Sequence, residues 1–205
     1  MFNGTYKTIS AEAEGLFRDK GSRFIGLAFP VKSETEVKKI LMEIKKKYYD
    51  ATHHCYAYYI GHIGNPSVRM NDDGEPSGTA GRPIYGQILS SELKDVLVVV
   101  VRYFGGTKLG VSKLMNAYKE TAKITINNAK IEEKKIKDMY TIEFKHSQMN
   151  EVMQVLKNNS VEIETISYLH DNVMITCSVV WAKKEEILGR LRTIYDIKQV
   201  YIATI

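Results

Sequence analysis

The sequence has 205 residues, of which 44% are hydrophobic and 26% are charged, and its formal net charge is +5. This composition is typical of an ordinary soluble globular protein. No apolar run approaches the roughly 20 residues of a membrane helix, and the N-terminus has no signal-peptide pattern. We therefore expect a cytoplasmic protein, without a membrane segment, that forms one large domain or two small ones.

Charge is distributed unevenly along the chain. Residues 1–137 contain 22 Lys and Arg against 15 Asp and Glu, whereas residues 138–205 contain 7 against 9. A polyanion is therefore expected to meet the first part of the chain. The alternative is that this modest excess is only the surface lysine that many proteins carry.

The first 50 residues predict two strands followed by a helix. Residues 4–9 and 23–31 are predicted as strands, and Gly15 and Gly21 indicate turns in the polar stretch between them. Ser33 and Glu36 form a capping box, after which apolar residues recur at helical spacing as far as Tyr48. The lysines of this helix lie largely off the apolar stripe, which favours a solvated face over polyanion contact.

Residues 52–61 predict a strand with His54 on one face and His53 and Cys55 on the other. Cys177 lies far away in another predicted strand, so we interpret both cysteines as reduced core residues.

The segment NDDGEPSGTAGRPI, Asn71–Ile84, is the densest polar cluster of the chain. Ser77 or Thr79 is expected to cap a helix that runs to about residue 90, because Pro83 is tolerated only near a first turn. The glycines at positions 78 and 81 are poor helix formers. We expect them to permit close packing, or the close approach of another backbone or a ligand.

The segment Val96–Gly110, VLVVVVRYFGGTKLG, carries a hydrophobic strand into a helix through glycines. Its six apolar residues predict a strand buried on both faces. Lys108 and the free amides of the helix start favour an anion site, although the glycines could simply make a tight turn. The loop lacks the Walker A sequence, so nucleotide hydrolysis is not expected. The helix that follows carries one apolar stripe: Val111, Leu114, Met115, Tyr118, Ala122, Ile126 and Ala129.

The remaining residues alternate as strand, helix, strand, strand, helix, strand, which predicts a ferredoxin-like βαββαβ domain with a binding or structural role. Residues 127–137 are polar and rich in lysine, which indicates a domain boundary. We therefore predict an α+β protein with one domain over residues 1–130, a linker over 131–137 and a second domain over 138–205.

Several ionisable side chains could in principle form a chemical site: His53, His54, Asp72, Asp73 and Glu75. A metal site is disfavoured because no HExxH or spaced cysteine pair occurs and adjacent strand histidines point to opposite faces. Acid–base chemistry by a histidine and a carboxylate is an alternative. Ser77 lacks the context of a hydrolase nucleophile. The ordinary account is that Asp72 and Asp73 bind turn amides, while Glu75 and Arg82 form surface ion pairs.

Basic and aromatic side chains are interleaved in the first part of the chain: Arg23, Arg69, Arg82, Arg102 and Lys108 beside Tyr56, Tyr58, Tyr103 and Phe104. Such a mixture suits single-stranded RNA, whose phosphates meet cations and whose bases stack on rings. The alternative is that the aromatic rings belong to the core.

Three segments together resemble the Impact/YigZ family: Gly21–Gly26, Asn71–Ile84 and Val99–Gly110, with His53–Gly61 between the first two. The resemblance covers about residues 1–130, and the second part resembles the ferredoxin-like C-terminal domain of YigZ-type members. It implies an N-terminal α/β sandwich similar to the second domain of a ribosomal small-subunit protein and to domain IV of elongation factor G. It also implies a C-terminal domain like domain V of that factor, and hence contact with RNA, the ribosome or translation factors.

Two departures limit what the resemblance implies. Eukaryotic Impact proteins control an initiation-factor kinase through an added N-terminal RWD domain, which we expect this chain to lack, so that role is not carried over. The segment Ser112–Asn116 departs from a family pattern that favours a further glycine and an arginine, and Lys113 could supply the positive charge instead. The resemblance implies no catalytic residues.

We therefore expect a non-catalytic protein that binds RNA or the translation apparatus, possessing neither cofactor nor metal and acting as a regulator of translation. The alternatives are a hydrolase or metal-dependent enzyme that uses His54, Asp72, Asp73 and Glu75, and a protein-interaction module. Residues 105–108 and 73–82 are expected to line one cleft. The expected binding residues are Arg23, His54, Asp73, Glu75, Ser77, Arg82, Arg102, Tyr103, Phe104, Gly105, Gly106, Thr107, Lys108 and Gly110.

Overall fold

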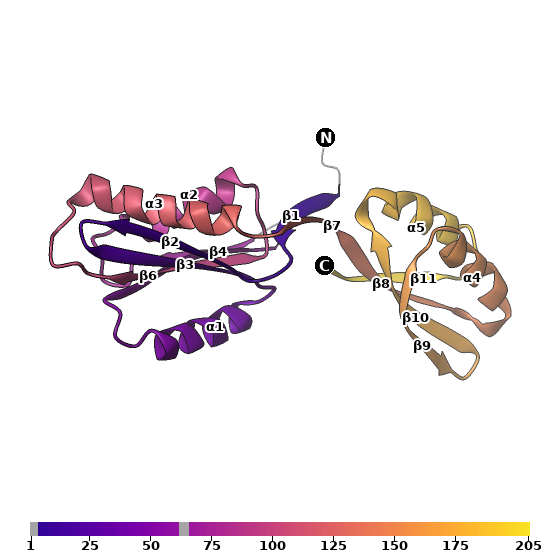
Figure 1. Ribbon diagram of the computed structural model, residues 1–205. Helices are drawn as coiled ribbons and strands as arrows, with labels where there is room; N and C mark the ends of the chain where they lie inside the picture. The colour runs from indigo at the N-terminus through magenta and orange to yellow at the C-terminus, as the bar shows by residue number, and fades with distance from the viewer. Residues whose placement is uncertain (1–3, 62–65) are drawn as a thin grey trace. The chain divides into compact units, whose positions relative to one another are not determined.

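The computed structural model describes residues 4–61 and 66–205, which form two compact units (Figure 1). One unit spans Tyr6–Lys134, and the other consists of Lys135–Ile205 with residues 4 and 5. Strand β7 (Ile131–Lys135) occupies most of the predicted linker and pairs with β1 (Thr5–Ile9) in a two-stranded sheet. Helices and strands occur in both units, so the α+β class predicted from the sequence is confirmed.

The first unit is built on a five-stranded sheet in which every neighbouring pair is antiparallel. Helix α1 (Glu34–Lys47) packs on one face of this sheet, and α2 (Gly81–Ser90) and α3 (Val111–Asn127) pack on the other (Figure 1). The strands, in their order across the sheet, are β2 (Ala13–Asp19), β3 (Ser22–Pro30), β6 (Val96–Tyr103), β4 (His53–Ile60) and β5 (Ser67–Asn71).

Strand β6 lies at the centre of the sheet, and its residues 96–101 are fully buried. Val96, Val98 and Val100 belong to the core under α2 and α3, whereas Leu97 and Val99 belong to the core under α1. Since both faces of the sheet are covered by helices, a strand here is apolar without alternation. The prediction of a strand buried on both faces is confirmed.

Helix α1 begins at the predicted cap. The Ser33 hydroxyl accepts a hydrogen bond from the Glu36 amide at 3.2 Å. The Glu36 carboxylate reaches back to the amide of Lys32 at 2.7 Å, one residue before the cap. Both bonds occupy amides that would otherwise lack a partner at the start of the helix.

The polar stretch between the first two predicted strands contains a further strand, β2, that the sequence did not predict. Gly15 lies within β2 opposite Gly26 of β3 and is not a turn residue, so that part of the prediction was wrong. A Cβ atom on either glycine would collide with Thr125 of α3. The two glycines therefore allow α3 to approach the sheet closely. Gly21, with φ of 79°, does lie between β2 and β3.

The apolar stripe of α3 is shifted from the predicted one. Val111 and Met115 are 58% and 38% exposed, whereas Thr121 and Thr125 are fully buried. Each threonine hydroxyl donates to the carbonyl oxygen four residues earlier, at 2.6 and 2.7 Å. These internal bonds let a polar side chain occupy the tight interface with the two glycines.

The second unit has the βαββαβ order that the sequence predicted, with the strands arranged β11-β8-β10-β9. Ile187, Leu188, Leu191 and Ile194 pack into its core, as does the buried, reduced Cys177. Across the described parts of the chain, no helix is long and apolar enough to cross a membrane. The elements of this unit are β8 (Lys137–Lys145), α4 (Met149–Asn158), β9 (Glu162–Leu169), β10 (Asn172–Val180), α5 (Lys184–Arg192) and β11 (Lys198–Thr204).

Candidate functional site

Asp72 organises the polar segment Asn71–Ile84. Its Oδ1 accepts hydrogen bonds from the amides of Ala80 at 3.0 Å and Gly81 at 2.8 Å, at the start of α2. A carboxylate from outside the helix thus satisfies the first amides and complements the positive end of the helix dipole. The N-cap residue, Ala80, has no capping side chain. The prediction that Ser77 or Thr79 caps this helix was wrong.

The two glycines of this segment have different roles. A Cβ atom on Gly81 would lie 2.8 Å from the backbone nitrogen of Asn71, so Gly81 permits a close approach of two backbone segments. Gly78 has a φ of 75° and open space around it, so its role is the left-handed conformation. Its amide donates to Asp72 Oδ2 at 2.8 Å.

Asp73 ties the same segment to β4 and α1. Its Oδ2 accepts from the His54 amide at 2.7 Å and its Oδ1 from the Lys45 ammonium at 3.2 Å. Burial acts to raise the pKa of Asp73, but the His54 amide and Lys45 outweigh it and lower that pKa. Asp73 is therefore a structural carboxylate on the α1 side.

Glu75 joins the polar segment to the central strand. Its Oε1 accepts a hydrogen bond from Arg102 Nη1 and another, at 2.8 Å, from the Tyr118 hydroxyl. His53 Nε2 lies 3.8 Å from the same oxygen. Glu75 and Arg102 are only 9% and 5% exposed, so this is a buried ion pair and not the surface pair with Arg82 that the sequence allowed.

The Arg102 guanidinium lies between two aromatic rings, with its Cζ 5.3 Å from the centroid of Phe24 and 5.5 Å from that of Phe104. Such rings favour a cation over their faces. The Nε of Arg102 is buried and has no acceptor among the described residues. Burial, with the neighbouring Cys55 and Glu75, raises the pKa of Tyr118 far above its ordinary value, so the phenol stays neutral and donates to Glu75.

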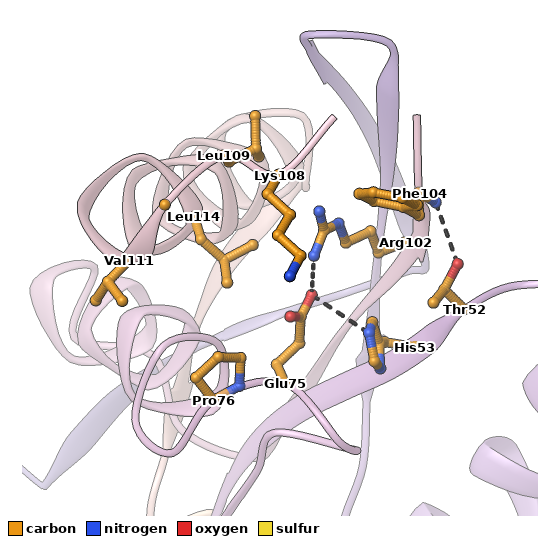
Figure 2. A pocket seen from close by; sticks show the side chains of 11 residues that line it. Thr52, His53, Glu75, Pro76, Arg102, Phe104, Lys108, Leu109, Val111 and Leu114 are labelled. Atoms are coloured by element: carbon orange, nitrogen blue, oxygen red, sulfur yellow. Dashed lines mark hydrogen bonds and ion pairs between the residues drawn. The ribbon is translucent and has the colours of Figure 1, made fainter. Parts of the chain in front are cut away.

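A cavity of about 380 Å³ opens over this pair (Figure 2). Its apolar wall consists of Pro76, Phe104, Leu109, Val111 and Leu114. Its polar lining consists of Thr52, His53, Glu75, Arg102 and Lys108, and the backbone of Gly110 completes it.

The start of α3 forms part of the cavity wall. Gly110, with φ of 80°, precedes the helix and has no capping side chain, and the first turn contains no acidic residue. The first amides of a helix carry a partial positive charge and bind anions. Figure 2 shows the Lys108 side chain reaching down toward the Glu75–Arg102 pair, and Lys108 has no ion-pair partner within residues 4–61 and 66–205. The cavity thus combines cationic donors with an apolar wall.

The structure brings five of the fourteen expected binding residues to this cavity: Glu75, Arg102, Phe104, Lys108 and Gly110. The polar segment and the central segment therefore share one cavity, through Glu75 on one side and Lys108 on the other.

Four others lie toward the α1 face of the sheet. The Arg23 guanidinium stacks 4.4 Å from the ring centroid of Tyr103, whose hydroxyl donates to Asp50. His54 Nε2 lies 2.9 Å from the carbonyl oxygen of Tyr48, and the His54 amide binds Asp73. These side chains are separated from the cavity by the sheet itself.

The remaining expected residues lie outside the cavity lining: Ser77, Arg82, Gly105, Gly106 and Thr107. Gly105 packs against the backbone of Gly21, where a Cβ atom would overlap it, and its amide donates to the Ser22 hydroxyl at 3.1 Å. Gly105 therefore permits the close approach of the protein's own backbone. Gly106, with φ of 83°, has open space around it.

The cavity also contains residues that the sequence did not single out as binding residues: Thr52, His53, Pro76, Leu109, Val111 and Leu114. Strand alternation correctly separated His53 from His54, but it does not show which face holds the cavity. The sequence did contain one indication of the cavity wall, because Val111 and Leu114 follow Lys108 closely at the predicted start of a helix.

The cluster of His54, Asp72, Asp73 and Glu75 considered for an enzyme does not surround one space. His54 and Asp73 bind each other on the α1 side, Asp72 binds the amides of α2, and Glu75 binds Arg102 at the cavity. In the part of the chain that the structure describes, no group of three or more His, Cys, Asp or Glu is arranged to hold a metal ion.

The fold and the cavity define a two-domain α+β protein whose first unit carries a cationic, partly apolar cavity. The profile of the Impact N-terminal domain matches residues 20–126. The chain is 34% identical over 164 residues to the IMPACT family member YvyE of Bacillus subtilis, covering 80% of this chain and 75% of that protein. The chain therefore belongs to the Impact family.

Two further comparisons agree with this assignment. The IMPACT family member YigZ of Escherichia coli is 30% identical over 138 residues, which cover 67% of this chain and 68% of that protein. A crystal structure described as a hypothetical protein has a TM-score of 0.75 at 25% identity, and the match covers 98% of this chain and 99% of that one. The likeness to that structure thus extends over both units.

Proposed function

We propose that this protein binds RNA of the translation apparatus through its first unit and regulates translation in the cytoplasm. The observation that supports the proposal best is the convergence of Lys108 and the positive end of α3 on one cavity. Cationic groups that meet phosphates supply most of a protein's affinity for nucleic acid. Beside them, the ring of Phe104 is 46% exposed and can stack on an unpaired base.

Two further observations support a partner of this kind. The excess of 22 basic over 15 acidic residues falls in residues 1–137, which include the cavity. The chain also belongs to the Impact family. The sequence resemblance to that family implies that its domains are similar to domains of a ribosomal protein and of elongation factor G, which supports an RNA partner.

Filter retention of single-stranded RNA over a series of salt concentrations tests the proposal. Affinity is expected to fall with salt, and Lys108→Glu is expected to reduce affinity about tenfold or more and the salt slope by about one. Lys119→Glu is the matched control, because it makes the same charge change at an exposed position of α3, the helix that follows Lys108, and Lys119 does not line the cavity. If RNA is not retained at about 50 mM salt, or if its retention does not change with salt, the proposal that RNA binds by electrostatic attraction is wrong.

Sedimentation through a sucrose gradient tests the biological setting. The wild-type protein is expected to travel with ribosomes at low salt, and Lys108→Glu is expected to stay at the top of the gradient while Lys119→Glu does not. If ribonuclease treatment leaves the capture of a partner protein unchanged, the ligand is a protein and the RNA proposal fails.

A further inference from the structure

The cavity has a size and lining suited to one small amphipathic group. Its volume of about 380 Å³ lies near the lower end of the range of about 300–1,000 Å³ found for small-molecule sites. A folded helix or a duplex cannot enter it. Pro76, Val111 and Leu114 offer an apolar surface opposite the exposed ring of Phe104. A flat group between these walls would be buried on one side and stacked on the other.

The net charge of the cavity lining favours a ligand with a single negative charge. Arg102 and Lys108 contribute two positive charges and Glu75 one negative charge, which leaves one positive charge, and the α3 N-terminus adds a partial one. Because Glu75 already neutralises Arg102 through a direct hydrogen bond, Lys108 is the cation left for a ligand. A phosphodiester carries one negative charge, whereas a free phosphate monoester carries nearly two.

The floor of the cavity has, among the described residues, one unused acceptor, a carboxylate oxygen of Glu75. The two bonds to Glu75 both fall on Oε1, and Figure 2 shows the second carboxylate oxygen turned away from Arg102 and His53. The buried Nε of Arg102 has no acceptor among the residues that the structure describes. The free carboxylate oxygen of Glu75 matches a planar group whose edge carries an N–H, whereas the buried Nε of Arg102 offers no surface to a ligand.

We propose that this cavity holds a single unstacked nucleotide, with its base between Phe104 and the apolar wall and its phosphodiester at Lys108 and the start of α3. An N–H on the edge of the base meets the free carboxylate oxygen of Glu75 at the floor. The assignment of this nucleotide to an RNA strand rests on the proposed function, whereas a small nucleotide phosphodiester free in solution would use the same contacts. A flipped base in a pocket is a common way of reading single-stranded RNA.

Titration of the full-length, ¹⁵N-labelled protein with four probes tests the ligand chemistry. The probes are a nucleoside 5′-phosphate methyl ester, the same nucleoside 5′-monophosphate, the nucleoside alone and inorganic phosphate. The methyl ester is expected to shift the amide signals of residues 110–113, and the monophosphate, which carries nearly two negative charges, is expected to bind more weakly than the methyl ester. The nucleoside and inorganic phosphate are each expected to bind at least about tenfold more weakly. Equal binding of inorganic phosphate would overturn the proposal, because it would leave only an anion site.

Paired variants test the location. Val111→Trp places a large ring at an exposed position of the cavity wall and is expected to weaken methyl ester binding about tenfold or more, whereas Met115→Trp, exposed on the same helix outside the cavity, is not. Phe104→Leu is expected to weaken binding about tenfold and Phe104→Tyr to preserve it, because only the tyrosine can stack. Circular dichroism shows whether each variant is folded.

The RNA and nucleotide measurements can contradict the proposed function and the nucleotide site independently of each other. If RNA is retained but Val111→Trp retains it equally and the nucleotides do not bind, the cavity is not the nucleotide site and the proposed function stands. If the methyl ester binds in the cavity but RNA is not retained, the nucleotide site stands, the proposed function fails, and the ligand is a small nucleotide phosphodiester. Binding of a short peptide through an apolar C-terminal residue, without binding of the methyl ester, would also overturn the proposal.

Discussion

Glu75 and Arg102, which lie 27 positions apart in the sequence, form a direct ion pair at the floor of the cavity with both side chains more than nine-tenths buried. Tyr118 donates a second hydrogen bond to the carboxylate, and two rings flank the guanidinium. A buried ion pair of this kind adds little to the free energy of unfolding compared with apolar residues of the same shape. Removal of one partner lowers that free energy strongly, because the other charge stays buried without a counter-charge. The pair therefore links the polar segment to β6.

Glu75→Gln is expected to destabilise the first unit by about 3–5 kcal/mol, because it leaves the Arg102 charge buried without a counter-charge. The double variant Glu75→Gln, Arg102→Met is expected to recover a large part of that loss. Residue-resolved hydrogen exchange of β6 measures both effects, and exchange in β8–β11 serves as the control. Equal stability of the single and double variants would contradict the account.

Asp72→Ala is expected to destabilise the first unit by about 2–3 kcal/mol, since three backbone amides lose a charged acceptor. Exchange is expected to accelerate first at the start of α2. Ser77→Ala, at the exposed position first predicted to cap that helix, is the control and is expected to change stability by less than about 0.5 kcal/mol. A larger effect at Ser77 would restore it as the cap.

Parts of this fold could be predicted because one local signal dominated. Six consecutive apolar residues in β6 indicate a strand buried on both faces without any need for alternation. The Ser33 cap binds the amide of Glu36, only three residues further along the chain. Strand β2 was not predicted, because its core-facing positions include Ala13 and Gly15 while Leu16 faces outward and is 48% exposed. A half-buried strand is usually recognised by large apolar residues on its core face and polar residues on its outer face, and β2 does not follow that alternation.

The cavity could be predicted only in part for a similar reason. Sequence spacing placed Lys108 at a helix start and grouped the acidic residues in one segment. It could not show that Asp72 turns to the α2 amides, Asp73 to the α1 side and Glu75 to the cavity. Those directions depend on backbone turns such as Asp73, with φ of 42°, and Gly74, with φ of 90°. Neighbouring side chains can thus reach different faces of the sheet.

Gly26→Ala is expected to destabilise the first unit by about 1–3 kcal/mol, because the new methyl group would overlap the Thr125 side chain. Thr125→Ala alone is expected to cost less, and adding it to Gly26→Ala is expected to restore part of the stability, since it removes the obstructing hydroxyl. A thermodynamic cycle of the four proteins measures this coupling by urea unfolding. Gly86→Ala, where a Cβ would meet open space, is the control. Additive effects at Gly26 and Thr125 would show that the two residues do not limit the approach of α3.

Acid is expected to weaken the first unit through Asp73. The pKa of this carboxyl is lowered in the folded protein from its ordinary value of 3.8, because its hydrogen bonds outweigh the opposing effect of burial. Its contribution to stability is therefore fully present above that value and is lost as the pH falls through the lower, folded pKa.

Asp73→Asn is expected to flatten the pH dependence of the unfolding free energy in this acidic range, because the amide oxygen can still accept from His54 but no longer titrates. The measurement is urea unfolding at a series of pH values from neutral to about pH 3, monitored by amide signals of β4. Glu12→Gln, at an exposed position of the same unit, controls for the loss of one negative charge. If Asp73→Asn and Glu12→Gln change the pH profile equally, the effect belongs to net charge and not to the contacts of Asp73 with His54 and Lys45.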